Sequence, residues 1–161
     1  YGFKGGAGYF INRHYTDYAK AGEHRDGMIR VSGVHWFTNL EHDKRHEDIP
    51  LYRHYTPEEY PKFENYDAIN VDKTSEIPCD YDGVMGVPIT FMDKYNPEQF
   101  EIIGVGIANL GLSCGVRPYS PEHKEYRKKV QKRGAVDGDL YMMVNGEVVV
   151  PFTRVLVRRK K

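Results

Sequence analysis

The sequence has few cysteines and no long apolar run, and both absences exclude classes of protein. Cys79 and Cys114 are the only cysteines among 161 residues, and neither has a neighbouring ligand at the spacing of a metal motif. A chain of this size with two cysteines is typical of a reducing compartment rather than of a disulfide-stapled secreted domain. No apolar run approaches the roughly 18 residues that a membrane helix needs. We therefore predict a cytoplasmic protein with no membrane segment.

The chain also lacks a starting methionine and the apolar core of a signal peptide. It opens Tyr-Gly-Phe-Lys-Gly-Gly, so we expect it to begin inside a longer protein. Its 161 residues are enough for one compact domain. Hydrophobic residues at 40% and charged residues at 29% are ordinary for a globular protein and exclude long disorder.

Charge is unevenly distributed along the chain although the formal net charge is zero. Residues 1–116 carry 11 basic and 18 acidic side chains, whereas residues 117–161 carry 12 basic and 5 acidic ones. This asymmetry indicates a polyanionic partner for the C-terminal part. The 13 tyrosines are expected mostly in strands and core, although tyrosine also suits wet interfaces.

Short apolar segments bounded by turn signals predict an α+β fold that is dominated by strands in a mixed sheet, with short helices. The predicted strands are residues 8–11, 28–40, 68–71, 84–92, 100–108, 140–144, 147–150 and 154–158. Pro88 predicts an edge position or a bulge for the strand that contains it. Residues 100–108 are interpreted as a buried strand. Asn145-Gly146 predicts a tight hairpin turn.

Helix-start signals occur at three places. Residues 56–59, Thr-Pro-Glu-Glu, form a capping box, but Pro61 limits that helix to about one turn. Residues 96–99, Asn-Pro-Glu-Gln, repeat the same pattern. Ser120-Pro121 opens the longest predicted helix, Pro121–Arg133, which Gly134 closes.

The helix predicted over residues 121–133 is strongly basic. Side chains three and four residues apart share a helix face, so Lys124, Lys128 or Arg127, and Lys132 are expected to form a stripe that neutralises phosphates. A solvated outer face is the alternative explanation of such a charge run. The preceding loop adds Asn109, Arg117 and Tyr119 as nominees for reading base edges. The predicted DNA-binding residues are thus Arg117, Tyr119, Lys124, Arg127, Lys128, Lys132 and Arg133.

Four blocks of sequence carry a resemblance to a known family. The longest, residues 81–104, reads Tyr-Asp-Gly-Val-Met-Gly-Val-Pro-Ile-Thr-Phe-Met-Asp-Lys-Tyr-Asn-Pro-Glu-Gln-Phe-Glu-Ile-Ile-Gly, and the others are residues 36–42, 66–69 and the ending from 144–147 through 154–159. In their order along the chain the blocks resemble adenine-specific DNA methyltransferases of the EcoRI-methylase type, the modification partners of restriction enzymes. Residues 44–60 and 109–138 match weakly, and homologous enzymes with different target sequences are expected to differ there.

Such enzymes need a catalytic tetrapeptide, Asn or Asp followed by Pro-Pro and an aromatic residue, which this sequence lacks. Residues 96–99 have the Asn and one Pro only, and a helix cap explains them. Residues 5–8 are glycine-rich, but the chain starts too late to show the strand that precedes a cofactor loop, and residues 9–11 look like a strand where such a loop needs a helix. His42 and His46 lack the Glu directly after the first His of a hydrolytic metal motif. We predict no catalytic, cofactor-binding or metal residue in this chain.

The resemblance implies a parent enzyme that transfers a methyl group from S-adenosylmethionine to N6 of adenine in duplex DNA. The catalytic tetrapeptide and cofactor pocket then lie upstream of Tyr1. Residues 1–42 are expected to complete the sheet of a Rossmann-like catalytic part, and residues 43–161 to form the DNA target-recognition region. The chain alone is expected to bind duplex DNA and the upstream catalytic part, to bind no cofactor, and to be inactive.

The alternative from the residues alone is a strand-rich interaction module. Its basic half would dock on an acidic protein, and its tyrosines would form the interface.

Overall fold

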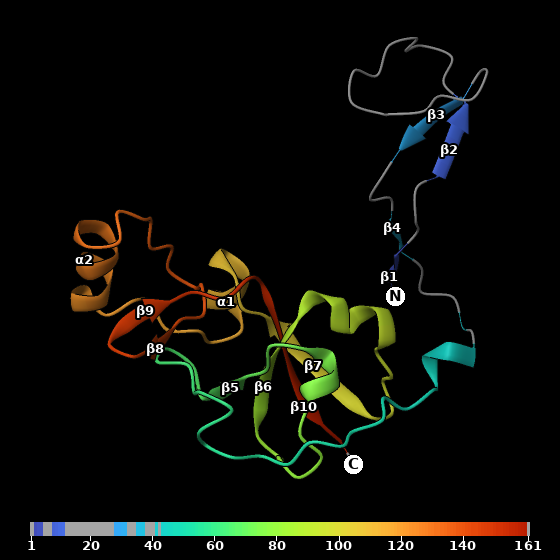
Figure 1. Cartoon of the computed structure of the whole chain (residues 1–161), viewed down its shortest axis with the longest axis horizontal. Helices are drawn as coiled ribbons and strands as arrows, with labels where there is room; N and C mark the ends of the chain where they lie inside the picture. The colour runs from blue at the N-terminus through green and yellow to red at the C-terminus, as the bar shows by residue number, and fades with distance from the viewer. Residues whose placement is uncertain are drawn as a thin grey trace. The chain divides into compact units, whose positions relative to one another are not determined.

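The computed structural model describes the backbone of residues 2–4, 8–11, 28–31, 35–37, 41 and 43–160. The chain forms two compact units, Tyr1–Glu41 and His42–Lys161 (Figure 1). Each unit is treated separately below. The functional division expected between residues 42 and 43 stays a prediction, because compactness alone does not assign a role to either unit.

Strands of the first unit pair as two antiparallel ribbons. The described strands are β1 (Gly2–Lys4), β2 (Gly8–Ile11), β3 (Met28–Val31) and β4 (His35–Phe37). β2 pairs with β3, and β1 pairs with β4, so the inner ribbon is nested within the outer one along the chain. The strand predicted over residues 8–11 is confirmed, whereas the stretch 28–40 contains two strands rather than one. Residues 5–7 and His42, which carried the cofactor-loop and metal interpretations, lie outside the described residues.

The second unit is a mixed α/β structure with a four-stranded sheet, a hairpin and short helices. Its elements are η1 (Asp43–Arg45), β5 (Ala68–Asn70), η2 (Thr74–Glu76), β6 (Val84–Pro88), η3 (Ile89–Lys94), β7 (Phe100–Val105), α1 (Ala108–Ser113), α2 (Pro121–Lys129), β8 (Met142–Val144), β9 (Glu147–Val149) and β10 (Arg154–Arg159), where η marks a 3-10 helix. The sheet order is β5-β6-β10-β7, with β5 parallel to β6 and the other pairs antiparallel. The predicted mixed sheet with short helices is confirmed.

Strand β10 runs through the middle of this sheet and is covered on both faces. Val155 and Val157 pack into one apolar cluster together with Met85 of β6, whereas Leu156 packs into a second cluster together with Phe63. Successive side chains of a strand point to opposite faces, so two cores meet on this one strand. Val155, Leu156 and Val157 are each at most 1% exposed. A strand that is covered on both faces needs consecutive apolar residues rather than alternating ones, which explains the sequence Val-Leu-Val at residues 155–157.

Two strand predictions are corrected by the sheet order. Pro88 predicted an edge strand or a bulge, but β6 lies between β5 and β10. The strand ends at Pro88, where η3 begins, so the missing N–H falls at the end of the ladder. The stretch 100–108, predicted as a buried strand, forms the edge strand β7, which stops at Val105 with its last four residues half-buried. Ala108 already starts α1, with its N–H donating to Asp139 Oδ1 at 2.9 Å.

The first two helix-start signals each produce a single turn. Thr56 O accepts the Tyr60 N–H at 3.2 Å, and the Thr56 hydroxyl accepts from Glu59 N at 3.4 Å. Asn96 is fully buried, and its Oδ1 accepts from Glu98 N at 2.9 Å. The cap interpretation of residues 96–99 is confirmed, because the Asn96 side chain is occupied by this turn and by Asp48, 2.8 Å from its Nδ2.

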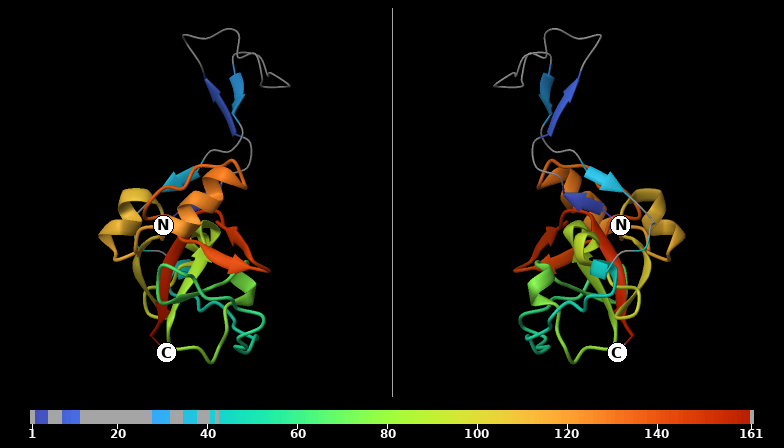
Figure 2. Two further views of the ribbon diagram at one scale, coloured as in Figure 1. Left: turned by 90° about the vertical axis from the view of Figure 1, so that its left-hand side faces the viewer. Right: turned by 90° about the vertical axis from the view of Figure 1, so that its right-hand side faces the viewer.

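The hairpin β8–β9 has the turn that the sequence predicts. Asn145 and Gly146 both adopt positive φ, 51° and 80°, as a type I′ turn requires. The register pairs Val144 with Glu147 and Met142 with Val149. Figure 2 shows the helix α2, in orange, at the same end of the unit as this hairpin, against which it packs. In the described part of the chain, no helix is both long enough and apolar enough to cross a bilayer.

Most tyrosines pack inside the second unit. Tyr60, Tyr119 and Tyr141 are at most 6% exposed. Of the tyrosines whose side chains the structure describes, only Tyr52 is exposed, at 79%. The five other described tyrosines are half-buried against the apolar clusters, so most of the described tyrosines contribute to the core, and the expected tyrosine interface stays a prediction.

Candidate nucleic-acid interface

Helix α2 begins where the sequence places it. Ser120 is the N-cap, and its hydroxyl accepts the His123 N–H at 3.2 Å. Pro121 follows at the first helical position, where its missing N–H costs nothing. No residue of this helix is buried, so all of its basic side chains are available at or near the surface.

The helix ends four residues earlier than predicted, at Lys129 rather than Arg133. Lys132 adopts φ 52°, in the left-handed region, and turns the chain back so that Arg133 N donates to Arg127 O at 3.0 Å. A tertiary contact explains the early end, because Gln131 Nε2 donates to Val148 O of the hairpin at 2.9 Å. Contact with β9 thus replaces the last predicted turn. Lys132 and Arg133 lie on a loop, not on the helix face.

The fold nevertheless gathers the expected basic residues at one place. A hollow on the surface is lined by Lys124, Lys128, Lys132 and Arg133, together with Gly134 and Ala135. We call these four charged residues the basic hollow. All four are exposed. The helix supplies two of the cations and the turn after it supplies the other two, so a surface that was expected along one helix face is built from two segments.

The four cations differ in how far they are already neutralised. Lys124 Nζ lies 2.8 Å from Asp137 Oδ2, and this contact is the main cause that holds the pKa of Asp137 below its ordinary value. Lys128, Lys132 and Arg133 have no ion-pair partner among the described residues. Those three therefore present the uncompensated positive charge of the hollow.

Arg127 has a different position from its neighbours. Its Nε donates to Gly134 O at 3.0 Å, and its Nη1 donates to Gln131 Oε1 at 3.2 Å. These bonds hold the turn after α2 against the helix. Arg127 therefore positions the residues that line the basic hollow without lining it itself. Together with Lys128 and Lys129 it also lies in the last turn, where cations stabilise a helix terminus by about 0.3–1 kcal/mol each.

Arg117 lies between α1 and α2, away from the basic hollow, and a buried asparagine holds it in place. Arg117 N donates to Asn65 O at 2.9 Å, and one guanidinium nitrogen donates to Glu64 O at 2.8 Å. Asn65, 2% exposed, also donates from Nδ2 to Arg117 O at 2.9 Å and to Asp139 O at 2.8 Å, and its Oδ1 accepts from Tyr141 N at 3.1 Å. This asparagine clamp joins the start and the end of the segment that carries the basic hollow.

Tyr119 is buried, unlike the other predicted contact residues. Its ring stacks on Tyr141 with centroids 4.2 Å apart and an interplanar angle of 7°. Burial raises the pKa of Tyr119 to about 12. Its hydroxyl has no hydrogen-bond partner among the described residues. The Tyr119 ring therefore packs residues 117–120 against Tyr141. Base reading by Tyr119 stays a prediction.

Residues 109–138 lie between the edge strand β7 and the β8–β9 hairpin, and the two ends of this segment meet at its base. Gly111 and Gly138 approach so closely that a Cβ on Gly111 would lie 1.9 Å from Gly138 O. Gly138 also has φ 95°, which favours glycine. Beside this contact, Asp139 accepts the Ala108 N–H. Asn109, nominated for base reading, is exposed on α1 near this base rather than in the basic hollow.

Two arginines of the basic C-terminal half are used inside the fold. Arg154, 7% exposed, donates from Nε to Asn70 Oδ1 at 2.9 Å and from Nη2 to Asp72 Oδ1 at 3.0 Å. Burial lowers its pKa, and the carboxylate of Asp72 opposes that change. Arg159 pairs with Asp82 at 2.9 Å and donates to the carbonyl of Cys79. Neither guanidinium belongs to the basic hollow.

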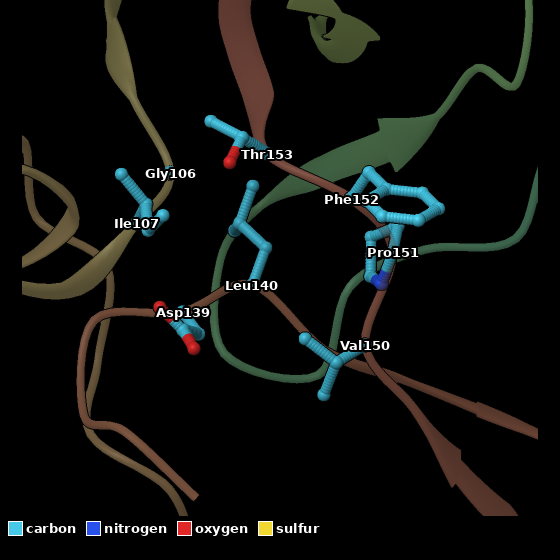
Figure 3. Close-up of a pocket in the computed structure, with 8 residues that line it drawn as sticks. All are labelled: Gly106, Ile107, Asp139, Leu140, Val150, Pro151, Phe152 and Thr153. Atoms are coloured by element: carbon cyan, nitrogen blue, oxygen red, sulfur yellow. The ribbon is translucent and has the colours of Figure 1, made fainter. Parts of the chain in front are cut away.

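An apolar hollow of about 220 Å³ lies at another place in the same unit (Figure 3). Its lining comes from three stretches of chain: residues 106–107 after β7, 139–140, and 150–153 before β10. Phe152 lies at its rim and is 91% exposed. Ile107, 36% exposed, lines the same hollow, and exposed apolar residues that adjoin one another are candidates for contact with a partner. Sequence reasoning missed both Phe152 and Asn65, because isolated Phe and Asn residues carry no local signal.

Comparison with known proteins gives a consistent family assignment. The family model of the EcoRI adenine-specific methyltransferase matches residues 1–160. The type II methyltransferase M.EcoRI of Escherichia coli is 46% identical over 125 residues, which cover 72% of this chain and 38% of that protein. The type II methyltransferase M.MpnI of Mycoplasma pneumoniae is 46% identical over 100 residues, or 60% of this chain and 28% of that protein.

A third relative has the same relationship to the chain. The type II methyltransferase M.MgeORF184P of Mycoplasma genitalium is 43% identical over 93 residues, 56% of this chain and 26% of its own length. The chain thus spans between about a quarter and two fifths of the curated relatives it matches. No solved structure matches the chain. The resemblance seen in the four sequence blocks is confirmed.

Proposed function

The chain belongs to the EcoRI family of adenine-specific methyltransferases, and we propose that it is the DNA-recognition part of a site-specific enzyme of that family. In this proposal the parent enzyme transfers a methyl group from S-adenosylmethionine to N6 of adenine in duplex DNA. The sequence lacks the catalytic tetrapeptide, so methyl transfer is assigned to a part that precedes residue 1. Residues 1–42 then complete the sheet of that Rossmann-like part, and residues 43–161 recognise the target.

The observation that carries the proposal is the basic hollow. Three of its cations, Lys128, Lys132 and Arg133, have no ion-pair partner among the described residues, and they meet at one surface. Cations that neutralise DNA phosphates release condensed counterions, which is the usual source of sequence-independent affinity. These contacts would position the chain on the duplex without reading bases.

Base recognition is assigned to the segment 109–138 that surrounds the hollow. The segment follows the edge strand β7 and precedes the β8–β9 hairpin, and its two ends are brought together by the Gly111–Gly138 contact and the Asn65 clamp. A segment closed in this way can change its sequence while the sheet remains the same. We expect this segment to differ between family members that recognise different target sites.

The experiment is a fluorescence-anisotropy titration of the chain with duplex DNA at two salt concentrations. We expect salt-sensitive binding that the double variant Lys128→Glu, Lys132→Glu weakens about tenfold or more. The matched control is Lys62→Glu with Lys94→Glu, which makes the same change of charge at exposed positions outside the hollow. Equal losses in both variants, or no loss in the first, would contradict the proposal.

A competition with heparin separates DNA recognition from general polyanion binding. The proposal predicts that duplex DNA competes more strongly than heparin at equal charge, and that one duplex sequence binds more tightly than others. If heparin competes equally well, the basic hollow binds polyanions without recognising DNA.

A second role, docking of the catalytic part of the same protein, is favoured by the exposed apolar rim at Phe152. This rim is chemically unlike the basic hollow, and Phe152 is 91% exposed. The Phe152→Ser variant is expected to leave DNA affinity and its salt dependence unchanged if the rim meets protein. Loss of DNA affinity in that variant would place Phe152 on the nucleic acid instead.

A further inference from the structure

A histidine, a cysteine and an aspartate meet outside the basic hollow. His54 Nδ1 lies 2.9 Å from Asp80 Oδ2 and 3.8 Å from Cys79 Sγ. The three ligand atoms all lie within 4.8 Å of one another. His54 comes from one loop, and Cys79-Asp80 comes from another, 25 residues further along the chain. Two separate segments thus direct a nitrogen, a sulfur and an oxygen at one point.

We propose that His54, Cys79 and Asp80 bind a transition-metal ion of the zinc class through Nδ1, Sγ and a carboxylate oxygen. Thiolate, imidazole and carboxylate together are a donor set for zinc, whereas calcium and magnesium take oxygen ligands only. Zinc bonds of about 2.0–2.3 Å in a tetrahedron place ligand atoms roughly 3.3–3.7 Å apart. The observed separations of 2.9 and 3.8 Å lie on either side of this range. All three ligand atoms lie within 4.8 Å of one another, so binding the ion requires these side chains to rotate towards a common point.

The backbone around the three residues holds the two loops together. Arg53 and Pro78 form an isolated parallel bridge, and Cys79 N donates to Arg53 O at 2.8 Å. The second carboxylate oxygen of Asp80 accepts from Tyr55 N at 2.7 Å. Outer contacts of this kind orient the ligands of a metal site. The loop 79–80 is also tied to the sheet through the guanidinium of Arg159 on β10, which donates to Cys79 O.

Solvent reaches the open side of the cluster. The His54 side chain is 76% exposed and that of Asp80 is 46% exposed. Three protein ligands with an accessible fourth position leave room for water on the ion. The site would join residues 53–55 to residues 79–80, two loops that already share a backbone bridge. It is independent of the proposed DNA contact, because none of the three residues lines the basic hollow.

The test is a titration of the metal-free chain with Co²⁺ under anaerobic conditions, followed by absorption spectroscopy. We expect one Co²⁺ per chain, with a thiolate-to-cobalt charge-transfer band. Cys79→Ser should abolish the band. Cys114→Ser should retain it, because Cys114 lies in another part of the fold, where its Sγ donates to Gly111 O at 3.3 Å. His54→Ala and Asp80→Asn should each weaken Co²⁺ binding about tenfold or more, and Zn²⁺ should displace the cobalt.

Circular dichroism of each variant shows that it is folded before the titration. Absence of the band in the folded parent chain would overturn the proposal, and so would a band that survives in Cys79→Ser but is lost in Cys114→Ser. Cobalt binding that is unchanged in both His54→Ala and Asp80→Asn would also overturn it. In each of those cases His54 and Asp80 form only a hydrogen bond, with Cys79 nearby.

Discussion

In the four-stranded sheet the central strand β10 is covered from both faces, whereas in the segment 109–138 no residue of α2 is buried. The sheet is held by apolar burial on two sides. The segment is held at its base by the Asn65 clamp and the Gly111–Gly138 contact, and on the hairpin by the Tyr119–Tyr141 stack and the hydrogen bond from Gln131 to Val148 O. Apolar burial restricts every position, but a clamp at the base leaves the exposed positions free. We propose that this difference lets one fold present different recognition surfaces.

Removing an apolar side chain from the sheet should have the largest effect. Leu156→Ala deletes a fully buried side chain and leaves a cavity, so the free energy of unfolding should fall by about 2–5 kcal/mol. Urea denaturation measures this change. The matched control is Leu110→Ala on α1, where the side chain is 59% exposed and the expected change is within about 0.5 kcal/mol. Similar losses in both variants would break the contrast between sheet and segment.

Cutting the clamp should have an intermediate effect on stability and a second effect on DNA binding. Asn65→Ala leaves the Tyr141 N–H without its partner and frees two carbonyls, at a cost of about 1–3 kcal/mol. DNA affinity should also fall, because the two ends of the segment are no longer held together. The control is Thr90→Ala, at an exposed position on η3 outside the segment, which should change neither quantity in urea denaturation or anisotropy. A stable Asn65→Ala variant with full affinity would show that the segment needs no clamp.

Neutralising single cations should change binding without changing stability. Lys128→Gln should lower the slope of log affinity against log salt by about one phosphate contact. Lys124→Gln should lower it less, since Asp137 already neutralises Lys124. Both unfolding energies should stay within about 0.5 kcal/mol of the parent chain. Equal slopes for the two variants would mean that the Lys124–Asp137 pair opens when DNA binds.

Tyr119→Phe should have the smallest effect at neutral pH and a larger one in alkali. The hydroxyl has no partner among the described residues, so its removal should change stability by about 1 kcal/mol or less near pH 7. Burial raises the pKa of Tyr119 from its ordinary value of 10 to about 12. Between those two pH values the unfolded chain ionises this tyrosine and the folded chain does not.

The sign of the alkaline effect follows from this difference. The free energy of unfolding contributed by Tyr119 is constant below pH 10 and falls by about 1.4 kcal/mol per pH unit as pH rises towards 12. The Phe variant lacks this loss, so the stability difference between the two chains should shift in its favour over that interval. Urea denaturation at several pH values measures it, and parallel curves for the two chains would contradict a buried Tyr119.

The sequence predicts the local elements better than their surroundings. The Asn145-Gly146 turn, the Ser120 cap and the central apolar run of β10 rest on local chemistry, and all three are present. The edge position predicted from Pro88 is wrong because strand order depends on contacts distant in sequence. The end of α2 was misplaced for the same reason, since Gln131 is drawn to Val148 of the hairpin.

The candidate site shows the same limit. Its basic residues are visible in the composition of residues 117–161, but their grouping into one hollow depends on the turn at Lys132. The burial of Tyr119 and the clamp of Asn65 depend on residues 22 and 76 positions apart from their partners, and no spacing rule reaches that far.

Hydrogen–deuterium exchange with and without duplex DNA at low salt would test the central claim most directly. The segment 121–135 should exchange more slowly when DNA is present, while β6 and β10 of the sheet should exchange at unchanged rates. Protection that is absent from residues 121–135 and appears instead around Phe152 or on the strands of the sheet would contradict the claim that DNA binds at the basic hollow.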